Sequence, residues 1–210
     1  MSHIVRRLLA TFQDKKLPVT RSHCTNASRM RWTFWAMAAF LLADSGHAAT
    51  ETAIRSIDIA HDSDAYIANV VMFAPVVTDV AWQVLTDFDH MAEWVPNVRE
   101  SKVIAREPNA VTIEQHGVAK FGIASFPYVS VRHIEPDPPR TIRSTQIKGN
   151  LRRLESLMTL APEGNGTKLV YHLEMVPGAF AAAVMSKEFL EHELREQFSA
   201  IIEEMVRRSR

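Results

Sequence analysis

Between residues 99 and 176 the chain alternates six β-rich segments with turn sequences, and this pattern limits the fold more than any other feature. The turns include EPN (107–109), PDPP (136–139), KGN (148–150) and EGNG (163–166). Proline fixes φ in such turns, while glycine and asparagine accept a positive φ. The six segments are 99–106, 110–120, 125–135, 140–147, 151–160 and 167–176. Consecutive strands joined by short turns predict an antiparallel meander.

A long amphipathic helix is predicted to follow the last strand, beginning near Ala181. Apolar residues recur three or four positions apart along one of its faces: Leu190, Leu194, Phe198, Ile201 and Met205. Glutamates placed four residues before arginines indicate that the opposite face of this helix is exposed to solvent. At about 1.5 Å per residue, this helix can cross a small domain. It is therefore the element that we expect to cover the apolar face of the sheet.

Two short helices are predicted before the meander. The first predicted strand is the β-rich run 66–73. Apolar residues then recur at helical spacing over 77–88, with Thr78 or Asp79 available as a cap, and a turn-length helix is expected at 89–93. The order predicts an α+β fold: a curved antiparallel β-sheet of about seven strands wrapped around a long C-terminal helix, with two short helices after the first strand.

Residues 1–48 have the order of a leader that precedes a folded domain at 49–210. A basic stretch is followed by an apolar run at 32–43 and then by small residues. This order is typical of a secretory signal peptide, predicted here at 30–48 with cleavage after Ala48 or the alanine that follows it. We therefore expect a periplasmic or secreted protein.

Other interpretations of the leader stay open. The run 32–43 is shorter than the roughly 20 residues that span a bilayer, but it could serve as an uncleaved membrane anchor. Residues 1–31 are rich in arginine and nearly free of acids, as in an organelle-targeting presequence, and Met30 is an alternative start. The one cysteine of the chain, Cys24, lies in this leader, so the predicted domain has to be held by packing without disulfides.

The charge of the predicted domain excludes nucleic acid as a partner. The first 48 residues hold seven of the 24 Lys and Arg residues but only two of the 24 Asp and Glu residues, so the rest of the chain has a net charge of −5. The sequence contains no phosphate-binding glycine loop and no HExxH motif. The pairs His90–Glu93 and Glu188–His192 each supply only two ligands, so no metal site, cofactor or catalytic residue is predicted.

Three stretches of the sequence suggest a family. FAPVVTDVAWQVLTDFDHMAEWVPNVRESKVI (73–104), GNLRRLESLMTLAP (149–162) and LEHELREQF (190–198) resemble the START-like superfamily (SRPBCC, helix-grip). Within it, the resemblance is to the polyketide cyclase/dehydrase group that includes coenzyme Q-binding START-domain proteins. It covers roughly residues 65–208. It implies a helix-grip fold with an elongated apolar cavity that binds lipids, quinones or polyketides, with catalysis in only some members.

An aromatic corner is the most specific part of this resemblance. Asp87 and Phe88 precede Trp94, and Pro96 follows just before a predicted strand. In the helix-grip arrangement the short helices flank the cavity mouth, which implies that Trp94 lies at the rim. The alternative is that Trp94 plugs the end of the core, where its burial contributes about 2–3 kcal/mol.

Strand alternation indicates which side chains face the cavity. Odd-numbered residues of 167–176 share one face, and His172 lies on the other. The same parity groups the odd-numbered residues of 110–120 and of 125–135. The predicted ligand-binding residues are Trp94, Gln115, Val131, His133, Tyr171, Leu173, Met175 and Phe198. The amide, imidazole and phenol of this set could hydrogen-bond a quinone carbonyl or a lipid headgroup, or be ordinary polar side chains. A slip of one position in register would reverse each assignment.

A dry cavity of about 300 Å³ would cost on the order of 7 kcal/mol, similar to the whole stability of a domain. We therefore expect a bound occupant: a quinone, lipid or isoprenoid-like molecule held by a non-enzymatic carrier, with transient membrane contact as a further expectation. The alternative is a cyclase/dehydratase-type enzyme acting on an aromatic or polyketide-like substrate, for which His133 and Tyr171 would act as an acid/base pair. A protein-interaction module is a third alternative, suggested by ribosome-association relatives in the same group, but the export signal and the acidic domain argue against it.

Overall fold

The computed structural model describes residues 53–121, 124–182 and 185–210. All of them belong to one compact unit, Ala43–Arg210. The predicted leader at 1–48, with its signal peptide at 30–48 and the apolar run 32–43, lies outside the described residues and stays a prediction. Within the described part, no helix combines the length and the apolar character needed to cross a membrane.

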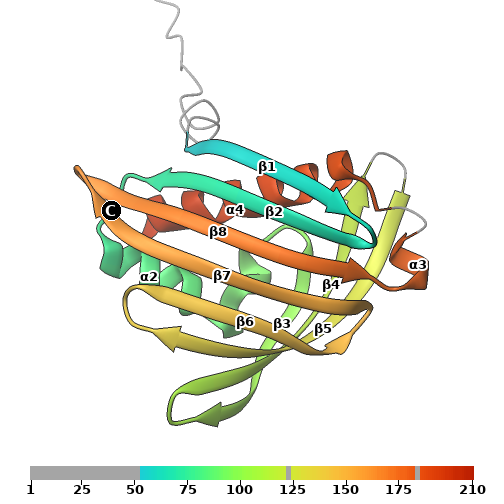
Figure 1. Ribbon diagram of the computed structural model, residues 1–210. Helices are drawn as coiled ribbons and strands as arrows, with labels where there is room; N and C mark the ends of the chain where they lie inside the picture. Colours follow the sequence, from blue (N-terminus) through green and yellow to red (C-terminus); the bar gives the residue numbers. More distant parts are fainter. Residues whose placement is uncertain (1–52, 122–123, 183–184) are drawn as a thin grey trace, which may run out of the picture. The chain divides into compact units, whose positions relative to one another are not determined.

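The described residues form one eight-stranded sheet in which every neighbouring pair is antiparallel (Figure 1). The spatial order is β1-β2-β8-β7-β6-β5-β4-β3, so β3 to β8 form the predicted meander and β2 pairs with the last strand. The strands are β1 (Ile54–Asp62), β2 (Ala65–Ala74), β3 (Val98–Glu107), β4 (Ala110–Phe121), β5 (Ala124–Asp137), β6 (Thr141–Gly149), β7 (Leu151–Glu163) and β8 (Gly166–Pro177). The prediction of about seven strands omitted β1. The two short helices consequently follow the second strand and not the first.

Four helices accompany the sheet in the described residues. They are α2 (Thr78–Thr86), the 3₁₀ helix η1 (Phe88–Glu93), α3 (Ala179–Ala182) and α4 (Lys187–Arg208). The first two confirm the predicted pair of short helices. The long helix begins at Lys187 and not near Ala181, because the Ser186 side chain accepts a hydrogen bond from the backbone N–H of Phe189 at 3.1 Å and caps a new helix there.

The core lies between the sheet and α4, which crosses behind β1, β2 and β8 in the view of Figure 1. In β2, Ala68, Val70 and Met72 are fully buried at alternate positions, as expected for a strand with one covered face. On α4, Leu194 and Met205 are among the buried residues that face them. The predicted helix-grip α+β architecture is confirmed.

Polar contacts tie α4 to the elements that precede the meander. Near its C-terminus, Arg208 Nη2 donates to Asp87 Oδ2 at 2.7 Å, in the junction between α2 and η1. Near its middle, Glu193 accepts a 2.7 Å hydrogen bond from Asn97 Nδ2 and a 3.0 Å hydrogen bond from the backbone N–H of Lys120. These bonds fix the distance between α4 and the β3–β4 end of the sheet, and so the width of the space between them.

Candidate functional site

A cavity of about 360 Å³ lies between the sheet, η1 and α4. Its lining is mainly apolar, and side chains from β4 to β8 and from α4 contribute to it. Representative apolar members are Phe88, Ile134, Leu154, Leu173 and Phe198. The volume lies in the range of small-molecule pockets. It is also close to the roughly 300 Å³ for which a bound occupant was expected from the cost of a dry cavity.

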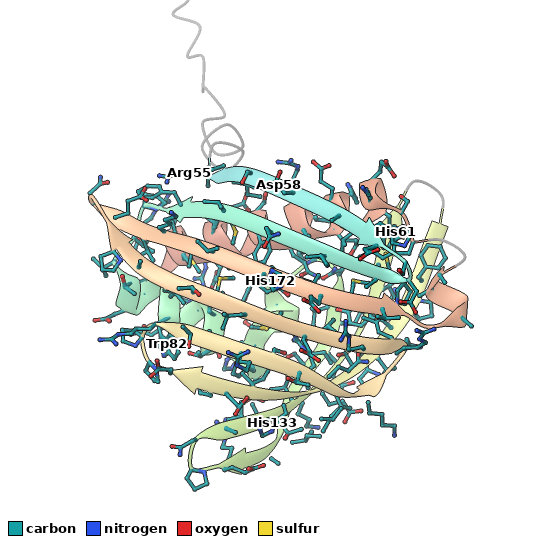
Figure 2. The ribbon with its side chains drawn as sticks, viewed as in Figure 1. Arg55, Asp58, His61, Trp82, His133 and His172 are labelled. Carbon is teal, nitrogen blue, oxygen red and sulfur yellow. The ribbon has the colours of Figure 1, made fainter. Side chains whose placement is uncertain are left out.

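Five of the eight predicted ligand-binding residues line this cavity: Gln115, Tyr171, Leu173, Met175 and Phe198. The Tyr171 ring meets the Phe198 ring edge-to-face at a centroid distance of 5.0 Å. This contact joins β8 to α4 across the cavity wall. The strand parity assigned to 110–120 and 167–176 is therefore the parity of the structure. His172 points away from the cavity, and its Nδ1–H donates a 2.8 Å hydrogen bond to Asn69 Oδ1 on the outer face (Figure 2).

The parity assigned to 125–135 was wrong. Between residues 130 and 134 the cavity is lined by the even-numbered Ser130, Arg132 and Ile134, whereas neither Val131 nor His133 is among the lining residues. Nearer the start of β5 both parities contribute, since Val129 lines the cavity beside Tyr128. Two valines made the odd-numbered face of this strand resemble a buried face. The strand instead directs its polar residues inward, since a binding site departs from the apolar-in pattern that packing alone would produce.

Trp94 does not line the cavity either, although Met91 and Val95 on either side of it do. Its ring is half-buried and packs against the hydrophobic core, and its Nε1–H is covered without a hydrogen-bond partner among the described residues. The structure thus places Trp94 in a packing position.

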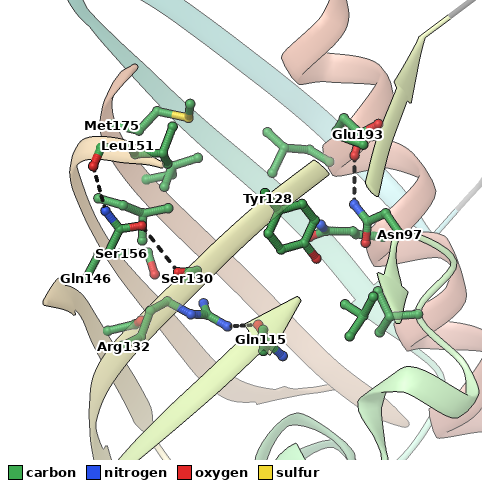
Figure 3. A pocket seen from close by; sticks show the side chains of 18 of the residues that line it. Asn97, Gln115, Tyr128, Ser130, Arg132, Gln146, Leu151, Ser156, Met175 and Glu193 are labelled. Atoms are coloured by element: carbon green, nitrogen blue, oxygen red, sulfur yellow. Dashed lines mark hydrogen bonds between the residues drawn. The ribbon is translucent and has the colours of Figure 1, made fainter. Parts of the chain in front are cut away.

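Arg132 was not among the predicted ligand-binding residues, yet it lines the cavity (Figure 3). It is the one Lys or Arg side chain of the described cavity lining. Its Nη2 donates to Gln115 Oε1 at 2.5 Å. The Gln115 amide is held in turn, because its Nε2 donates to Ser101 Oγ at 3.0 Å and that hydroxyl donates to the backbone carbonyl of Phe88 at 2.5 Å. This chain of hydrogen bonds fixes the guanidinium from one side, while its Nε is buried without a partner among the described residues.

Arg132 is half-buried, so part of its surface is accessible, and Arg132 is one of the residues that line the cavity. Burial nevertheless lowers the pKa of the guanidinium, and the nearby phenols of Tyr171 and Tyr128 oppose that effect. The ordinary pKa of an arginine lies so far above neutral that Arg132 stays charged at neutral pH despite this lowering. The cavity therefore contains a positive charge beneath apolar walls.

Two tyrosines of the lining stay protonated at physiological pH. Burial raises the pKa of Tyr128 to about 12, against a smaller opposing effect of Arg132. Burial likewise raises the pKa of Tyr171, more than the Ser156 hydroxyl and Arg132 lower it. Both hydroxyl groups are thus suited to hydrogen bonding and poorly suited to removing a proton.

A second polar group lies at the α4 side of the cavity. Burial raises the pKa of the Glu193 carboxyl, although the hydrogen bonds from Asn97 and the backbone of Lys120 partly offset this. The Oδ1 atom of Asn97 is buried without a partner among the described residues. In Figure 3 the ring of Tyr128 lies between this pair and Arg132.

The described residues form neither a metal-ligand cluster nor the acid/base pair that the sequence suggested. Within the described ranges, no group of three or more His, Cys, Asp and Glu side chains is placed to hold a metal ion. The His133–Tyr171 pair that cyclase chemistry would need is not formed, since Tyr171 lines the cavity and His133 does not.

A family model for polyketide cyclase / dehydrase and lipid transport matches residues 75–203, more than half of the chain. The chain belongs to the polyketide cyclase / dehydrase and lipid transport family. The match includes η1, the whole β3–β8 meander and most of α4, which are the elements that enclose the cavity. No curated protein matches the sequence.

Solved structures show that this fold recurs at low sequence identity. A Thermus thermophilus protein superposes with a TM-score of 0.60 at 15% identity, covering 69% of this chain and 99% of its own. The Zhui aromatase/cyclase of a Streptomyces species gives 0.59 at 17%, covering 70% and 96%. A STAR-related lipid transfer protein of Xanthomonas axonopodis gives 0.56 at 15%, covering 71% and 98%. At these identities the likeness establishes the fold alone.

Proposed function

We propose that this member of the polyketide cyclase / dehydrase and lipid transport family binds and carries a hydrophobic small molecule in the cavity between its sheet and α4. The observation that carries the proposal is the cavity itself: about 360 Å³, enclosed mainly by apolar side chains. Such a volume left dry would cost several kcal/mol of stability, on the order of the whole stability of a domain. An occupant relieves that cost, and apolar walls favour a hydrophobic one.

The finer identity of the ligand is a quinone, a lipid or an isoprenoid-like molecule. A lipid transfer protein and an aromatase/cyclase share the fold, so both transport and cyclisation occur on this scaffold. The described lining favours transport, because its polar groups are amides, hydroxyl groups, one arginine and the Glu193 carboxyl, with no imidazole beside them. Both oxygens of that carboxyl already accept hydrogen bonds, from Asn97 and from the backbone of Lys120. The leader leads us to propose in addition that the chain acts in the periplasm or is secreted, and that it meets its ligand at a membrane surface.

Native mass spectrometry of the purified full-length chain, followed by lipid extraction, tests this function. We expect a bound hydrophobic molecule at about one per chain. Replacing Leu173 in the cavity wall with Asp should abolish retention, whereas the matched change Leu157→Asp on the neighbouring strand, outside the cavity lining, should preserve it. A chain that is empty as purified and takes up neither quinones nor lipids would overturn the proposal. Expression of the same full-length gene with purification from the periplasm, followed by mass measurement of the exported chain, would show separately whether cleavage occurs after Ala48 or the next residue.

A further inference from the structure

The charge of the cavity identifies the class of ligand more narrowly than its apolar walls do. We propose that the ligand is a carboxylated amphiphile whose carboxylate pairs with Arg132, an inference that rests on the proposed function. It differs from the neutral quinone among the candidates above, because it requires one negative charge at a defined place in an otherwise apolar body.

Arg132 has no counter-ion among the described residues. None of the ion pairs within 4.0 Å among the described residues includes its guanidinium, and the described lining contains one carboxylate, Glu193. Both Glu193 oxygens are already occupied, one by Asn97 Nδ2 and the other by the backbone N–H of Lys120. Charges removed from water are stable only when they are paired or fully hydrogen-bonded. The guanidinium therefore lacks a negative partner among the described residues.

Two of the three lining residues with an unfilled hydrogen bond, Arg132 and Ser144, come from the adjacent strands β5 and β6, while the third, Asn97, lies on the α4 side of the cavity. Arg132 Nε is buried without a partner, and so is the Ser144 hydroxyl, which also lines the cavity. Gln115 occupies only one Nη2 proton, and Gln115 is itself held by Ser101. A guanidinium with free N–H groups matches the two oxygens of a carboxylate, and a nearby hydroxyl can donate a further hydrogen bond. Native proteins rarely leave several such groups unpaired unless a ligand or water completes them.

A carboxylate fits this arrangement better than the other headgroups considered. A quinone oxygen accepts hydrogen bonds but brings no charge to neutralise the arginine. A phosphate brings up to two charges and more oxygens, whereas the described lining contains one cation, Arg132, and no lysine or histidine. One charge opposite one charge leaves the occupied cavity neutral at this end, while the apolar walls take the rest of the molecule.

Isothermal titration of the full-length chain, stripped of bound lipid, with four probes of similar chain length tests this assignment. The probes are dodecanoate, dodecan-1-ol, decylubiquinone and dodecyl phosphate, each below its micelle concentration at pH 7.5. We expect dodecanoate to bind about tenfold to a hundredfold more tightly than dodecan-1-ol, the range for charge-assisted hydrogen bonds. Arg132→Met should abolish this preference while its binding of dodecan-1-ol changes by less than about threefold.

Two further variants keep the test decisive. Arg143→Met removes an exposed arginine of β6 that is not part of the cavity lining and should leave all four affinities unchanged. Arg132→Lys keeps the charge without the fork and should retain a reduced preference for dodecanoate, even if the Met variant folds poorly. Any of three results would overturn the carboxylate assignment alone. Dodecanoate could bind no more tightly than the neutral probes, dodecyl phosphate could bind more tightly than dodecanoate, or the preference for dodecanoate could persist in Arg132→Met. Failure of the wild-type chain to bind any probe would overturn the proposed function with it.

Discussion

Gly117 in β4 is a position where adding a single methyl group should disturb the packing of the β3–β4 end of the sheet. A Cβ built there would collide with the backbone oxygen of Asn97 and with the ring of Tyr128. That Asn97 oxygen accepts the backbone N–H of Val118 at 2.9 Å, and backbone cannot move aside as a flexible side chain can. We expect Gly117→Ala to lower the free energy of unfolding by about 1–3 kcal/mol in urea denaturation. Gly164→Asn is the control: at φ 58° with no atom within 4 Å, it should change stability by less than about 0.5 kcal/mol.

Glu193 should make stability depend on pH in an unusual direction for an acid. Burial raises its pKa in the folded state, so the folded chain holds the proton more tightly than the unfolded chain. The stability contributed by protonation is fully present below the unfolded pKa of about 4.3 and is lost as pH rises through the higher folded pKa. Relative to Glu193→Gln, the wild-type chain should therefore lose stability as pH increases from about 4 to 7. Urea denaturation of both chains across this interval checks the sign. A constant difference, or one that changes in favour of wild type, would contradict it.

The side chains of the site differ in how far sequence could locate them. Tyr171, Leu173 and Met175 alternate in a strand whose inward face is apolar, so parity alone places them correctly. Arg132 breaks that logic, because a charged residue that follows Val131 in the chain suggests an outward position on packing grounds. The available signal was the even-numbered Phe126, with Tyr128 and Ile134 on the same face, which together outweigh the valines.

At the scale of elements, α4 should contribute much of the stability of the domain through one face. Met205 is fully buried, 0% exposed, near its C-terminal end. We expect Met205→Ala to destabilise the chain by about 2–5 kcal/mol, through lost burial and the cavity that it leaves. Glu203→Ala, two residues earlier on the exposed face, should stay within about 0.5 kcal/mol of wild type. Thermal and urea unfolding by circular dichroism measure both, and equal effects would show that α4 does not pack as described.

The boundaries of elements could be predicted where the spacing of apolar residues changes. They could not be predicted where a single capping hydrogen bond determines the first residue of a helix. The change from helical spacing to strand alternation near residue 96 is visible in the sequence, and η1 and β3 meet there. The start of α4 depends on Ser186, since the run of alanines before it has equally high helix propensity. Strand β1 was missed because its apolar positions alternate with Arg55, Asp58 and His61, which suit the exposed face of an edge strand.

At the scale of the whole domain, the order of elements determines the fold, while the size of the cavity depends on how closely α4 approaches the sheet. A meander followed by one long amphipathic helix leaves few arrangements that cover the apolar face. The separation of helix and sheet instead depends on particular contacts, such as Glu193 with Asn97 and Arg208 with Asp87. Sequence periodicity carries no information about such distances, so the existence of a cavity could be argued in advance but its lining could not.

The cavity should also couple ligand binding to the stability of the domain. A ligand at about 100 times its Kd stabilises the native state by about 2.7 kcal/mol, which corresponds to a rise in Tm of about 5–10 °C for a chain of this size. Leu173→Trp, which adds a larger ring to the cavity wall, should remove this shift for dodecanoate. The variant without ligand should be as stable as the wild-type chain without ligand or about 1–2 kcal/mol more stable, because part of the void is filled. The matched Leu157→Trp, outside the cavity lining, should keep the wild-type shift. Thermal unfolding of the three chains with and without dodecanoate measures both effects. A wild-type-sized shift in Leu173→Trp would place the ligand outside the cavity, because a filled binding site and an undiminished linkage between binding and unfolding are incompatible.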